Sequence, residues 1–586
     1  MKILAAVDIG NSTTEVCLAE ENDAGRIRFL SSASVPTTGL KGSVSNVTGI
    51  MTALGTSIHD ISHIRINEAA PVIGGAAMDT LTQTIVTEAS MLGHNPKTPA
   101  GVGTAYGKTV KIENLERLET REPCIVIISS ETGYETAADK INRSSADITG
   151  VILQQDEAVL VYNRLNVKIP IIDEVRDIHK IKENIETAIE TALPGQAISM
   201  LSNPYGIATL LKLTPEETTQ VTPIANSLIG AKSAAVMKTP WKNQAPKQKI
   251  GKITIKGDRN IEVNFTQGAD TVTQAIESAG KISNIIGESG TNIGDMLASA
   301  TQSMSALADG EQVQIRDLFA VDTSAPVAVS GALAGETSLE KAIAVAAMVT
   351  AGRLPMEAIA QELSKKTGIY TTVAGVEPVM AALGALTTPG AGFPLAVLDL
   401  GGGSTDAAIL YDDGTVKSVS LAGAGELVTL MIQSQLGLAS RQTAENIKKY
   451  PAAKVESMFH IRMENGEVIF YDEGIDPRFF GSVIVLTPEG MIKIDEDRPI
   501  EKIVKVRQDA KRGVFVKNAT RAIKRLEHDV IKHVILVGGS AEDFEIPAFI
   551  STAFAEMGMV CGRGNIRGIE GARNAVATGL IMGLTQ

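Results

Sequence analysis

Cysteine, histidine and long apolar runs are scarce in this 586-residue sequence, and each scarcity excludes a class of protein. The three cysteines, Cys17, Cys124 and Cys561, lie far apart and form no CxxC pair. This excludes a disulfide scaffold and argues against a cysteine-bound zinc or iron–sulfur site. The seven histidines are scattered without an HExxH motif, so a histidine metal site has no support. No apolar run reaches about 18 residues, and the apolar N-terminal stretch is too short for a signal peptide.

Positive charge is also in short supply. The chain has 54 basic and 67 acidic side chains, a formal charge of −13. This excess of acid disfavours general binding to nucleic acid or to anionic membranes. Hydrophobic residues at 44% and charged residues at 21% are ordinary globular values, and the length argues for several domains. We therefore expect a multidomain cytoplasmic protein without nucleic-acid or membrane partners.

A short polar turn between two apolar stretches stands near the N-terminus. Residues 3–7 read ILAAV, residues 8–16 read DIGNSTTEV, and CLA follows. A strand, a glycine-containing turn and a returning strand form a hairpin whose backbone N–H groups can surround a phosphate. Asp8, at the strand end, could hold a Mg²⁺-bound water beside that phosphate. One such turn can equally be an ordinary hairpin.

The same pattern returns almost 400 residues later, which turns a weak signal into a strong one. Residues 395–398 read LAVL, and DLGGGSTD follows from Asp399 to Asp406 before another apolar stretch. Both copies share a strand, an Asp, a Gly, small polar residues, a Thr and an acid. Two copies of a phosphate hairpin predict a duplicated fold whose halves face each other across a nucleotide.

This arrangement resembles the actin, sugar kinase and Hsp70 ATPase superfamily, and further segments match it in order. Residues 375–384 (GVEPVMAALG) resemble the first connecting helix. In that family the Glu at this position lies near the γ-phosphate, which implies the same place for Glu377. The alternative is that Glu377 is only an acid at a helix N-terminus, where the helix dipole favours it. Residues 422–426 (AGAGE) resemble the segment after the second hairpin. Residues 534–540 (VILVGGS) resemble the strand and turn at the adenosine, and residues 571–579 resemble the second connecting helix, with Arg573 at the base.

Glu445 and Lys448 lie at positions i and i+3, and therefore on one face of a helix. Without context, a surface ion pair would be the simpler interpretation. Hsp70-like proteins place a Glu and a Lys at this spacing against the adenosine, so we favour a nucleotide role for both.

Nearly the whole chain resembles one family, the large subunits of diol and glycerol dehydratase reactivases. The specific strings are RINEAAPVIGG, MLGHNPKTP, GVILQQD, SNPYGIAT, GESGTNIGDM, IKKYPAAKVES and GRGNIRGIEGARNAVATGL, together with both hairpins. The implied α/β fold is a duplicated actin-like (Hsp70-type) ATPase domain with an inserted swivelling α/β domain, a helical linker and a small β-rich insert. The expected boundaries are 1–88, 321–454 and 511–586 for the ATPase domain, 89–250 for the swivelling domain, 251–320 for the linker and 455–510 for the insert.

The sequence between the hairpins is consistent with such insertions. PCIVIISS (123–130) and ITGVILQQ (148–155) predict parallel strands with a helix near residues 140–147, and residues 238–249 predict a linker. Residues 269–282 and 294–308 predict amphipathic helices.

The resemblance implies a chaperone-like activity. Such a reactivase releases damaged cobalamin from an inactivated adenosylcobalamin-dependent dehydratase, so that intact coenzyme can enter. The expected partners are a reactivase small subunit, in a heterotetramer of two large and two small subunits, and a diol or glycerol dehydratase. ATP and ADP are the implied nucleotides, with slow hydrolysis and Mg²⁺. The location is expected to be cytoplasmic, with or without a bacterial microcompartment.

The family's site residues carry over to matching positions of this sequence. The implied catalytic residues are Asp8, Glu377 and Asp399. The implied nucleotide-binding residues are Asn11, Ser12, Thr13, Gly401, Gly402, Gly403, Glu445, Asn446, Ile447, Lys448, Gly539, Ser540 and Arg573. A second divalent ion, Mg²⁺ or Ca²⁺, is implied where the two subunits meet, with Thr98, Asp156 and Asp173 as ligands.

Other classes of function stay open at this point. The first alternative is a small-molecule kinase of the same superfamily. The others are an iron–sulfur activator, which the isolated cysteines disfavour, and a filament-forming actin relative, which the large insertions disfavour.

Overall fold

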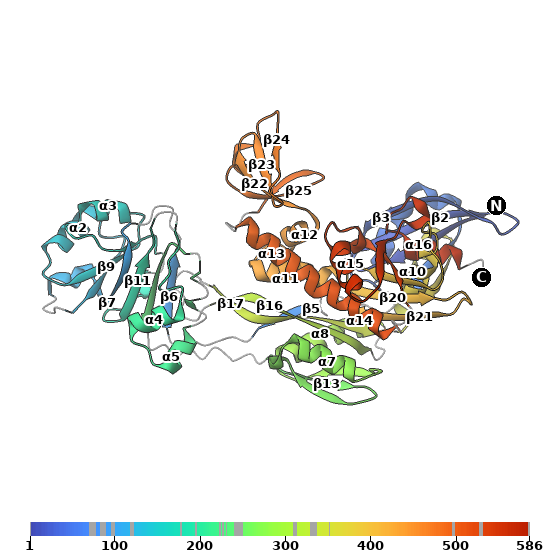
Figure 1. Ribbon diagram of the computed structural model, residues 1–586, viewed down its shortest axis with the longest axis horizontal. Helices are drawn as coiled ribbons and strands as arrows, with labels where there is room; N and C mark the ends of the chain where they lie inside the picture. Colours follow the sequence, from blue (N-terminus) through green and yellow to red (C-terminus); the bar gives the residue numbers. More distant parts are fainter. Residues whose placement is uncertain are drawn as a thin grey trace. The chain divides into compact units, whose positions relative to one another are not determined.

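The chain divides into two compact units in the computed structural model (Figure 1). The first unit comprises Met1–Leu81, Lys249–Thr323 and Ala342–Gln586, and the second comprises Thr82–Gln248 and Ser324–Lys341. The structure describes residues 2–68, 78–82, 89–94, 100–117, 122–175, 178–193, 196–221, 224–225, 228–229, 231–238, 250–308, 313–328, 337–350, 352–494, 499–526 and 531–583.

The first hairpin lies at the centre of a five-stranded sheet of the first unit. The sheet has the order β18-β4-β1-β2-β3, with β1 antiparallel to β2 and parallel to β4. Helices α1 and α9 cover one of its two apolar faces, because buried side chains of β1, β2 and β4 pack against both helices. The elements are β1 Lys2–Ile9, β2 Thr13–Glu21, β3 Ile27–Pro36, α1 Asn46–Leu54, β4 Ile61–Glu68, α9 Leu354–Thr367 and β18 Tyr370–Val376.

The second hairpin occupies the same position in a second five-stranded sheet. Its order is β21-β20-β19-β27-β28, with β19 antiparallel to β20 and parallel to β27. Asp399 pairs with Asp406 across this hairpin as Asp8 pairs with Glu15 across the first. The duplication predicted from the repeated motif is therefore present. The strands are β19 Leu395–Leu400, β20 Ser404–Leu410, β21 Val416–Ala422, β27 His533–Val537 and β28 Val560–Arg563.

Two short helices cross between the sheets at glycines. A Cβ atom on Gly384 of α10 would collide with the backbone oxygen of Ala575, and one on Gly579 of α16 with that of Met380. Only glycine permits this approach. These helices are α10 Glu377–Ala385 and α16 Ala575–Met582. The other helices around the second sheet are α11 Gly425–Leu436, α12 Arg441–Lys449, α13 Ile500–Lys511, a π-helix Arg512–Val516, α14 Lys517–Arg525 and α15 Ile546–Glu556.

The linker region is only partly the helical segment expected from sequence. Both predicted helices are present, but they pack with a three-stranded sheet of order β14-β13-β15. The prediction missed KITIK, whose Ile253 and Ile255 are buried in alternation, the period-2 pattern of a strand. The elements are β13 Lys252–Lys256, β14 Ile261–Asn264, α7 Ala269–Ser278, β15 Asn284–Gly287 and α8 Asn292–Leu307.

The small insert is a five-stranded antiparallel sheet of order β24-β23-β22-β25-β26. The last residues of the predicted insert, from Ile500 onwards, form helix α13 instead of strands. The strands are β22 Ala452–Ser457, β23 His460–Met463, β24 Val468–Phe470, β25 Val483–Thr487 and β26 Gly490–Lys493.

The second unit contains a seven-stranded mixed sheet of order β10-β9-β8-β7-β11-β12-β6. The predicted parallel pairing of the strands around residues 123–130 and 148–155 is confirmed, and the helix between them begins earlier than expected. The elements are β6 Ala89–His94, β7 Gly103–Lys111, β8 Cys124–Ile128, α2 Tyr134–Arg143, β9 Ile148–Leu153, α3 Ala158–Arg164, β10 Ile171–Ile172, β11 Glu186–Thr191, α4 Pro204–Leu211, α5 Pro215–Gln220 and β12 Ser233–Lys238.

Two long strands carry the chain across the division between the units. They are β16 Gln314–Ala328 and β17 Thr337–Thr350, which form a sheet with β5 Met78–Thr82. Only the first residue of the expected linker at 238–249 is described; residues 239–249 lie outside the described residues. Within the described part of the chain, no helix is long and apolar enough to cross a membrane.

Candidate nucleotide-binding site

The turns of the two hairpins meet face to face. Each turn is closed by a backbone hydrogen bond, from Gly10 N to Thr13 O at 2.9 Å and from Gly401 N to Ser404 O at 3.2 Å. A Cβ atom on Gly403 would lie 2.6 Å from Nδ2 of Asn11, and one on Gly402 would collide with Oγ of Ser12. The second loop therefore lies in close contact with the side chains of the first, and a larger residue at either glycine would displace Asn11 or Ser12.

A cleft of about 280 Å³ opens between these loops and gathers most of the predicted nucleotide residues. Its lining comes from both halves of the duplicated fold. The predicted residues that line it are Asp8, Asn11, Ser12, Thr13, Glu377, Asp399, Gly401, Gly402, Glu445, Lys448, Gly539, Ser540 and Arg573. Glu15 and Arg573, which are 558 positions apart in the chain, also contact each other here.

The floor of the cleft holds buried carboxyl groups with abnormal proton affinity. Burial, together with the charge of Glu377, raises the pKa of Asp8 and of Asp399 well above the usual range. The same two causes raise the pKa of Asp406 to about 6. Oδ1 of Asp8 is buried and has no hydrogen-bond partner among the described residues. A cation bound beside these carboxyl groups would lower their pKa values again, because a nearby positive charge favours the ionised form.

These residues fit a Mg²⁺–nucleotide complex better than a metal ion alone. In the described part of the chain, no group of three or more His, Cys, Asp or Glu side chains could hold a metal by itself. Mg²⁺ commonly takes one or two protein carboxylates and completes its shell with water and phosphate oxygens. Asp8 and Asp399 are suited to supply these carboxylates, and the glycine-containing loops are suited to surround the phosphates.

Lys41 is a buried cation that the sequence analysis missed. Its Nζ lies 2.6 Å from Oε2 of Glu377, and the two side chains are 3% and 10% exposed. Burial alone would lower the pKa of Lys41, but the carboxylates of Glu377 and Asp8 hold it above the ordinary value. No local motif marks Lys41, since its partner is 336 positions away. Glu377 is the first residue of α10, so the helix dipole also favours its charge.

Helix α12 supplies the ion pair predicted at the adenosine end. Nζ of Lys448 lies 2.7 Å from Oε2 of Glu445 and donates to Gly425 O at 3.1 Å and to Thr429 Oγ1 at 2.8 Å. Burial would raise the pKa of Glu445, but Lys448 lowers it to about 2. This is not a solvated surface pair, because the Lys448 side chain is only 11% exposed.

The side chains between this pair lie on another face of α12. Ile447 is fully buried in the hydrophobic core, and the Asn446 side chain accepts a hydrogen bond from Gln442 at 3.0 Å. Neither lines the cleft, and Gly403 does not line it either. Asn446 and Ile447 point away from the cleft because positions i and i+3 share one face of a helix, and the two positions between them do not.

Arg573 lies beside the Gly538–Gly539 turn, where the base is expected. Its guanidinium nitrogens would lie 3.4 Å from a Cβ on Gly539, and Nη1 is 2.9 Å from Oε1 of Glu15. Glu15 also accepts the backbone N–H of Asn574 at 2.7 Å. Glu15 was not predicted as a site residue, although the acid shared by both hairpin motifs was a signal for it.

The predicted interface metal site lies in the second unit and is only partly described. Thr98 lies outside the described residues. Asp156 is exposed, whereas Asp173 is buried and its Oδ2 accepts from the backbone N–H of Ala158 at 3.0 Å. The ligand role of this set stays a prediction.

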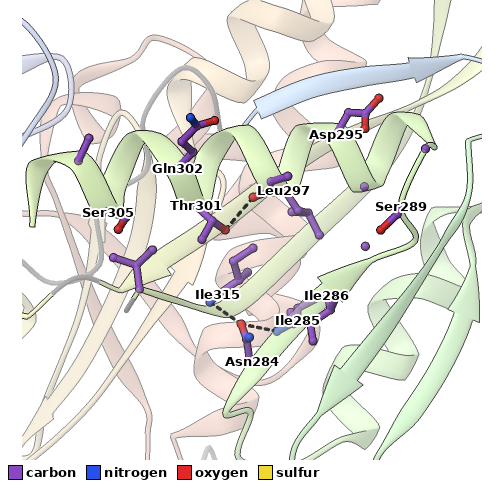
Figure 2. Close-up of a pocket in the computed structure, with 16 residues that line it drawn as sticks. Asn284, Ile285, Ile286, Ser289, Asp295, Leu297, Thr301, Gln302, Ser305 and Ile315 are labelled. Atoms are coloured by element: carbon purple, nitrogen blue, oxygen red, sulfur yellow. Dashed lines mark hydrogen bonds between the residues drawn. The ribbon is translucent and has the colours of Figure 1, made fainter. Parts of the chain in front are cut away.

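A larger groove, of about 810 Å³, runs between α8, β15 and the start of β16 (Figure 2). Among the described residues that line it, Asp295 is the one with an ionisable side chain. The carboxamide oxygen of Asn284 accepts from the backbone N–H groups of Ile285 and Ile315, which joins β15 to β16. The groove has no cation in the part of its lining that the structure describes, although Gly290 lies in a turn there with φ of 71°. The smaller cleft combines Lys448 and Arg573 with both hairpin loops, so it is the candidate nucleotide site.

The paired hairpins, their facing loops and the cleft between them define an ATPase-like, nucleotide-binding protein of the actin-like class. Residues 263–584 match the family described as diol dehydratase reactivase ATPase-like domain, and residues 86–243 match the DD-reactivating factor swiveling domain. The chain belongs to the diol dehydratase reactivase family.

Similar proteins cover the chain from end to end. It is 47% identical over 600 positions to the diol dehydratase-reactivating factor large subunit of Klebsiella michiganensis, covering 99% of this chain and 98% of that relative. It is 46% identical, with the same coverage, to the propanediol dehydratase-reactivating factor large subunit of Salmonella typhimurium. The solved diol dehydratase-reactivating factor in nucleotide-free form has a TM-score of 0.83 at 46% identity, and a glycerol dehydratase reactivase has 0.80 at 43%; both matches cover 100% of each chain. The predicted family and fold class are confirmed.

Proposed function

We propose that this chain is the large subunit of an ATP-dependent reactivating factor for an adenosylcobalamin-dependent diol or glycerol dehydratase. The factor would release damaged cobalamin from the inactivated enzyme so that intact coenzyme can bind. The observation that carries this proposal is the 47% identity, over 99% of the chain, to a diol dehydratase-reactivating factor large subunit. The cleft described above supports it, because most predicted nucleotide residues line one cavity.

The nucleotide would be bound by side chains and loops with distinct parts. The hairpin loops around Ser12 and Gly402 would surround the phosphates, and Asp8 and Asp399 would hold water bound to Mg²⁺. Glu377, whose carboxylate pairs with Lys41, is suited to orient the attacking water. Lys448 and Glu445 would line the adenosine.

The output would be a conformational change and not a phosphorylated product. A nucleotide shifts a conformational equilibrium only if it binds the two conformations with different affinity. We infer that ATP and ADP favour different arrangements of the large subunit, and that these differ in affinity for the small subunit and the dehydratase. Hydrolysis would then reset the cycle.

The partners would be a small subunit, in a heterotetramer, and the dehydratase itself. Asp156 and Asp173 would contribute to a Mg²⁺ or Ca²⁺ site where the subunits meet, with Thr98 and a partner ligand completing it. The cytoplasm, with or without a microcompartment, stays the predicted location.

The test is recovery of turnover by an inactivated dehydratase. A diol dehydratase and a glycerol dehydratase, each blocked with cyanocobalamin, would be mixed with both purified subunits, Mg²⁺ and fresh adenosylcobalamin. Turnover should return with ATP and not without it, and not with a non-hydrolysable analogue. Asp8→Asn should abolish the recovery, whereas Asp412→Asn, the same change at an exposed turn, should not.

A negative result has a clear meaning. If neither dehydratase recovers although the chain binds ATP, the proposed function is wrong. The kinase alternative gains no support from any relative reported above.

A further inference from the structure

Strand β16 carries a buried acid that no motif marks. Asp317 is 2% exposed and lies on β16 in the first unit. Its Oδ2 accepts the backbone N–H of Ala422 at 2.9 Å, and its Oδ1 accepts from Arg521 at 3.1 Å and from Arg525 at 3.3 Å. A buried carboxylate with three donors is well compensated. Removing it would leave the Ala422 N–H without its acceptor and would leave Glu277 as the remaining carboxylate of the two arginines.

The segment that Asp317 holds is itself bonded to the second phosphate loop. Three successive contacts join the two stretches of backbone: Gly423 N to Gly403 O at 2.9 Å, Gly425 N to Gly401 O at 3.3 Å and Glu426 N to Gly402 O at 2.8 Å. The Glu426 carboxylate also accepts from Ser12 Oγ of the first loop at 3.1 Å. The segment 422–426 therefore supports the second loop through its backbone and contacts the first.

Other side chains fix the same segment from the opposite side. Nδ2 of Asn518 donates to Ala422 O and Gly423 O, each at 2.7 Å. Gly423 has φ of 92°, and a Cβ there would lie 2.8 Å from Cδ1 of Phe319 on β16. Its backbone conformation and its close contact with β16 thus both require glycine. The segment has little freedom to move without β16.

We propose that Asp317 is a positioning residue for the second phosphate loop and ties the position of that loop to strand β16. Displacement of Gly401–Gly403 by nucleotide phosphates passes through segment 422–426 to Asp317. Strand β16 continues past Thr323 into the second unit, so the linkage lies on a covalent route between the two units. This inference rests on nucleotide binding in the cleft, as in the proposed function, but not on reactivation of a dehydratase.

The chain offers a matched control for the ion pairs. Arg521 and Arg525 also bind Glu277 of α7, each at 2.8 Å. Glu277→Gln removes one carboxylate from the same two arginines without touching Ala422. Asp317→Ala removes the acceptor of Ala422 N as well, and Asp317→Asn keeps an oxygen that can accept that bond.

The experiment measures MgATP affinity by calorimetry and amide hydrogen exchange of the full chain, with and without saturating MgATP. In the wild type, MgATP should slow exchange in the loop 401–403 and in β16 around Ile315–Val321. Asp317→Ala should weaken MgATP binding about tenfold, the scale of one buried hydrogen bond. At saturation it should keep protection of the loop and lose the change in β16. Asp317→Asn and Glu277→Gln should stay within about threefold of wild-type affinity and keep the β16 response.

Several results would overturn the inference. One is a β16 response to MgATP in Asp317→Ala equal to that of the wild type. Another is equal loss of the response in Glu277→Gln, which would assign it to the arginine cluster. If Asp317→Ala does not fold, Asp317→Asn decides. A tenfold loss of MgATP affinity in that variant would count against the proposal, because the variant keeps an acceptor for the Ala422 N–H and the loss would then come from the arginine pairs. A wild-type chain that binds MgATP without any change in β16 overturns this inference only, whereas failure to bind MgATP contradicts the proposed function.

Discussion

The buried pair of Lys41 and Glu377 gives the sharpest test of the cleft. Lys41→Met removes the cation and keeps most of the side-chain volume, but leaves Glu377 buried close to other acids. Removing one partner of a buried ion pair costs about 3–5 kcal/mol, because the remaining charge is uncompensated. Glu377 begins α10, so the loss should be visible in the opening free energy of that helix, measured by amide hydrogen exchange.

The double variant Lys41→Met, Glu377→Gln separates charge from packing. It removes the charge of Glu377, the direct partner of Lys41, together with that of Lys41, so most of the lost stability should return. Lys252→Met is the control. Its pair with Glu262 is nearly as short, at 2.8 Å, but the two side chains are 44% and 59% exposed, so little change in exchange is expected. The reasoning is refuted if Lys41→Met costs less than about 1 kcal/mol, or if the double variant is no more stable than the single one.

Three further predictions concern the other site residues. Asp8→Asn and Asp399→Asn should each raise the free energy of unfolding at pH 7.5. Burial raises the folded-state pKa of both carboxyls, so ionising them at high pH destabilises the folded state. The stability gained by either substitution should therefore shrink as the pH falls towards the unfolded-state pKa of about 4. Urea unfolding at several pH values measures this gain, and a gain that grows at low pH would contradict the prediction. Lys448→Met should lower ATP affinity about tenfold in calorimetry, through loss of its bonds to Gly425 O and the adjacent carboxylate, and unchanged affinity would contradict the assigned role. Asp156→Ala combined with Asp173→Ala should weaken binding of the small subunit in sedimentation experiments and spare ADP binding, and equal loss of both would show that the two sites are not separate.

Local patterns were enough to predict the elements that carry their own signature. Each hairpin is one strand, one tight turn and one strand, so its residues are contiguous, from Lys2 to Glu21 in the first and from Leu395 to Leu410 in the second. The repetition of that unit predicted the duplicated fold, and the glycine-containing helices followed from the family resemblance. The strands β13 to β15 of the linker were missed because they are only four or five residues long, and such short alternation is easily hidden beside two clear helices.

The sequence by itself determined the fold class, the family and the two hairpin loops that line the cleft, because these depend on contiguous residues. The tertiary structure alone decided which distant charges meet. Lys41 reaches Glu377, Glu15 reaches Arg573, and Asp317 reaches Ala422, all across long separations in the chain. The pKa shifts have the same origin, since burial and neighbouring charges cause them. A buried charge must find its partner wherever the packed core places it, and no local pattern records that position.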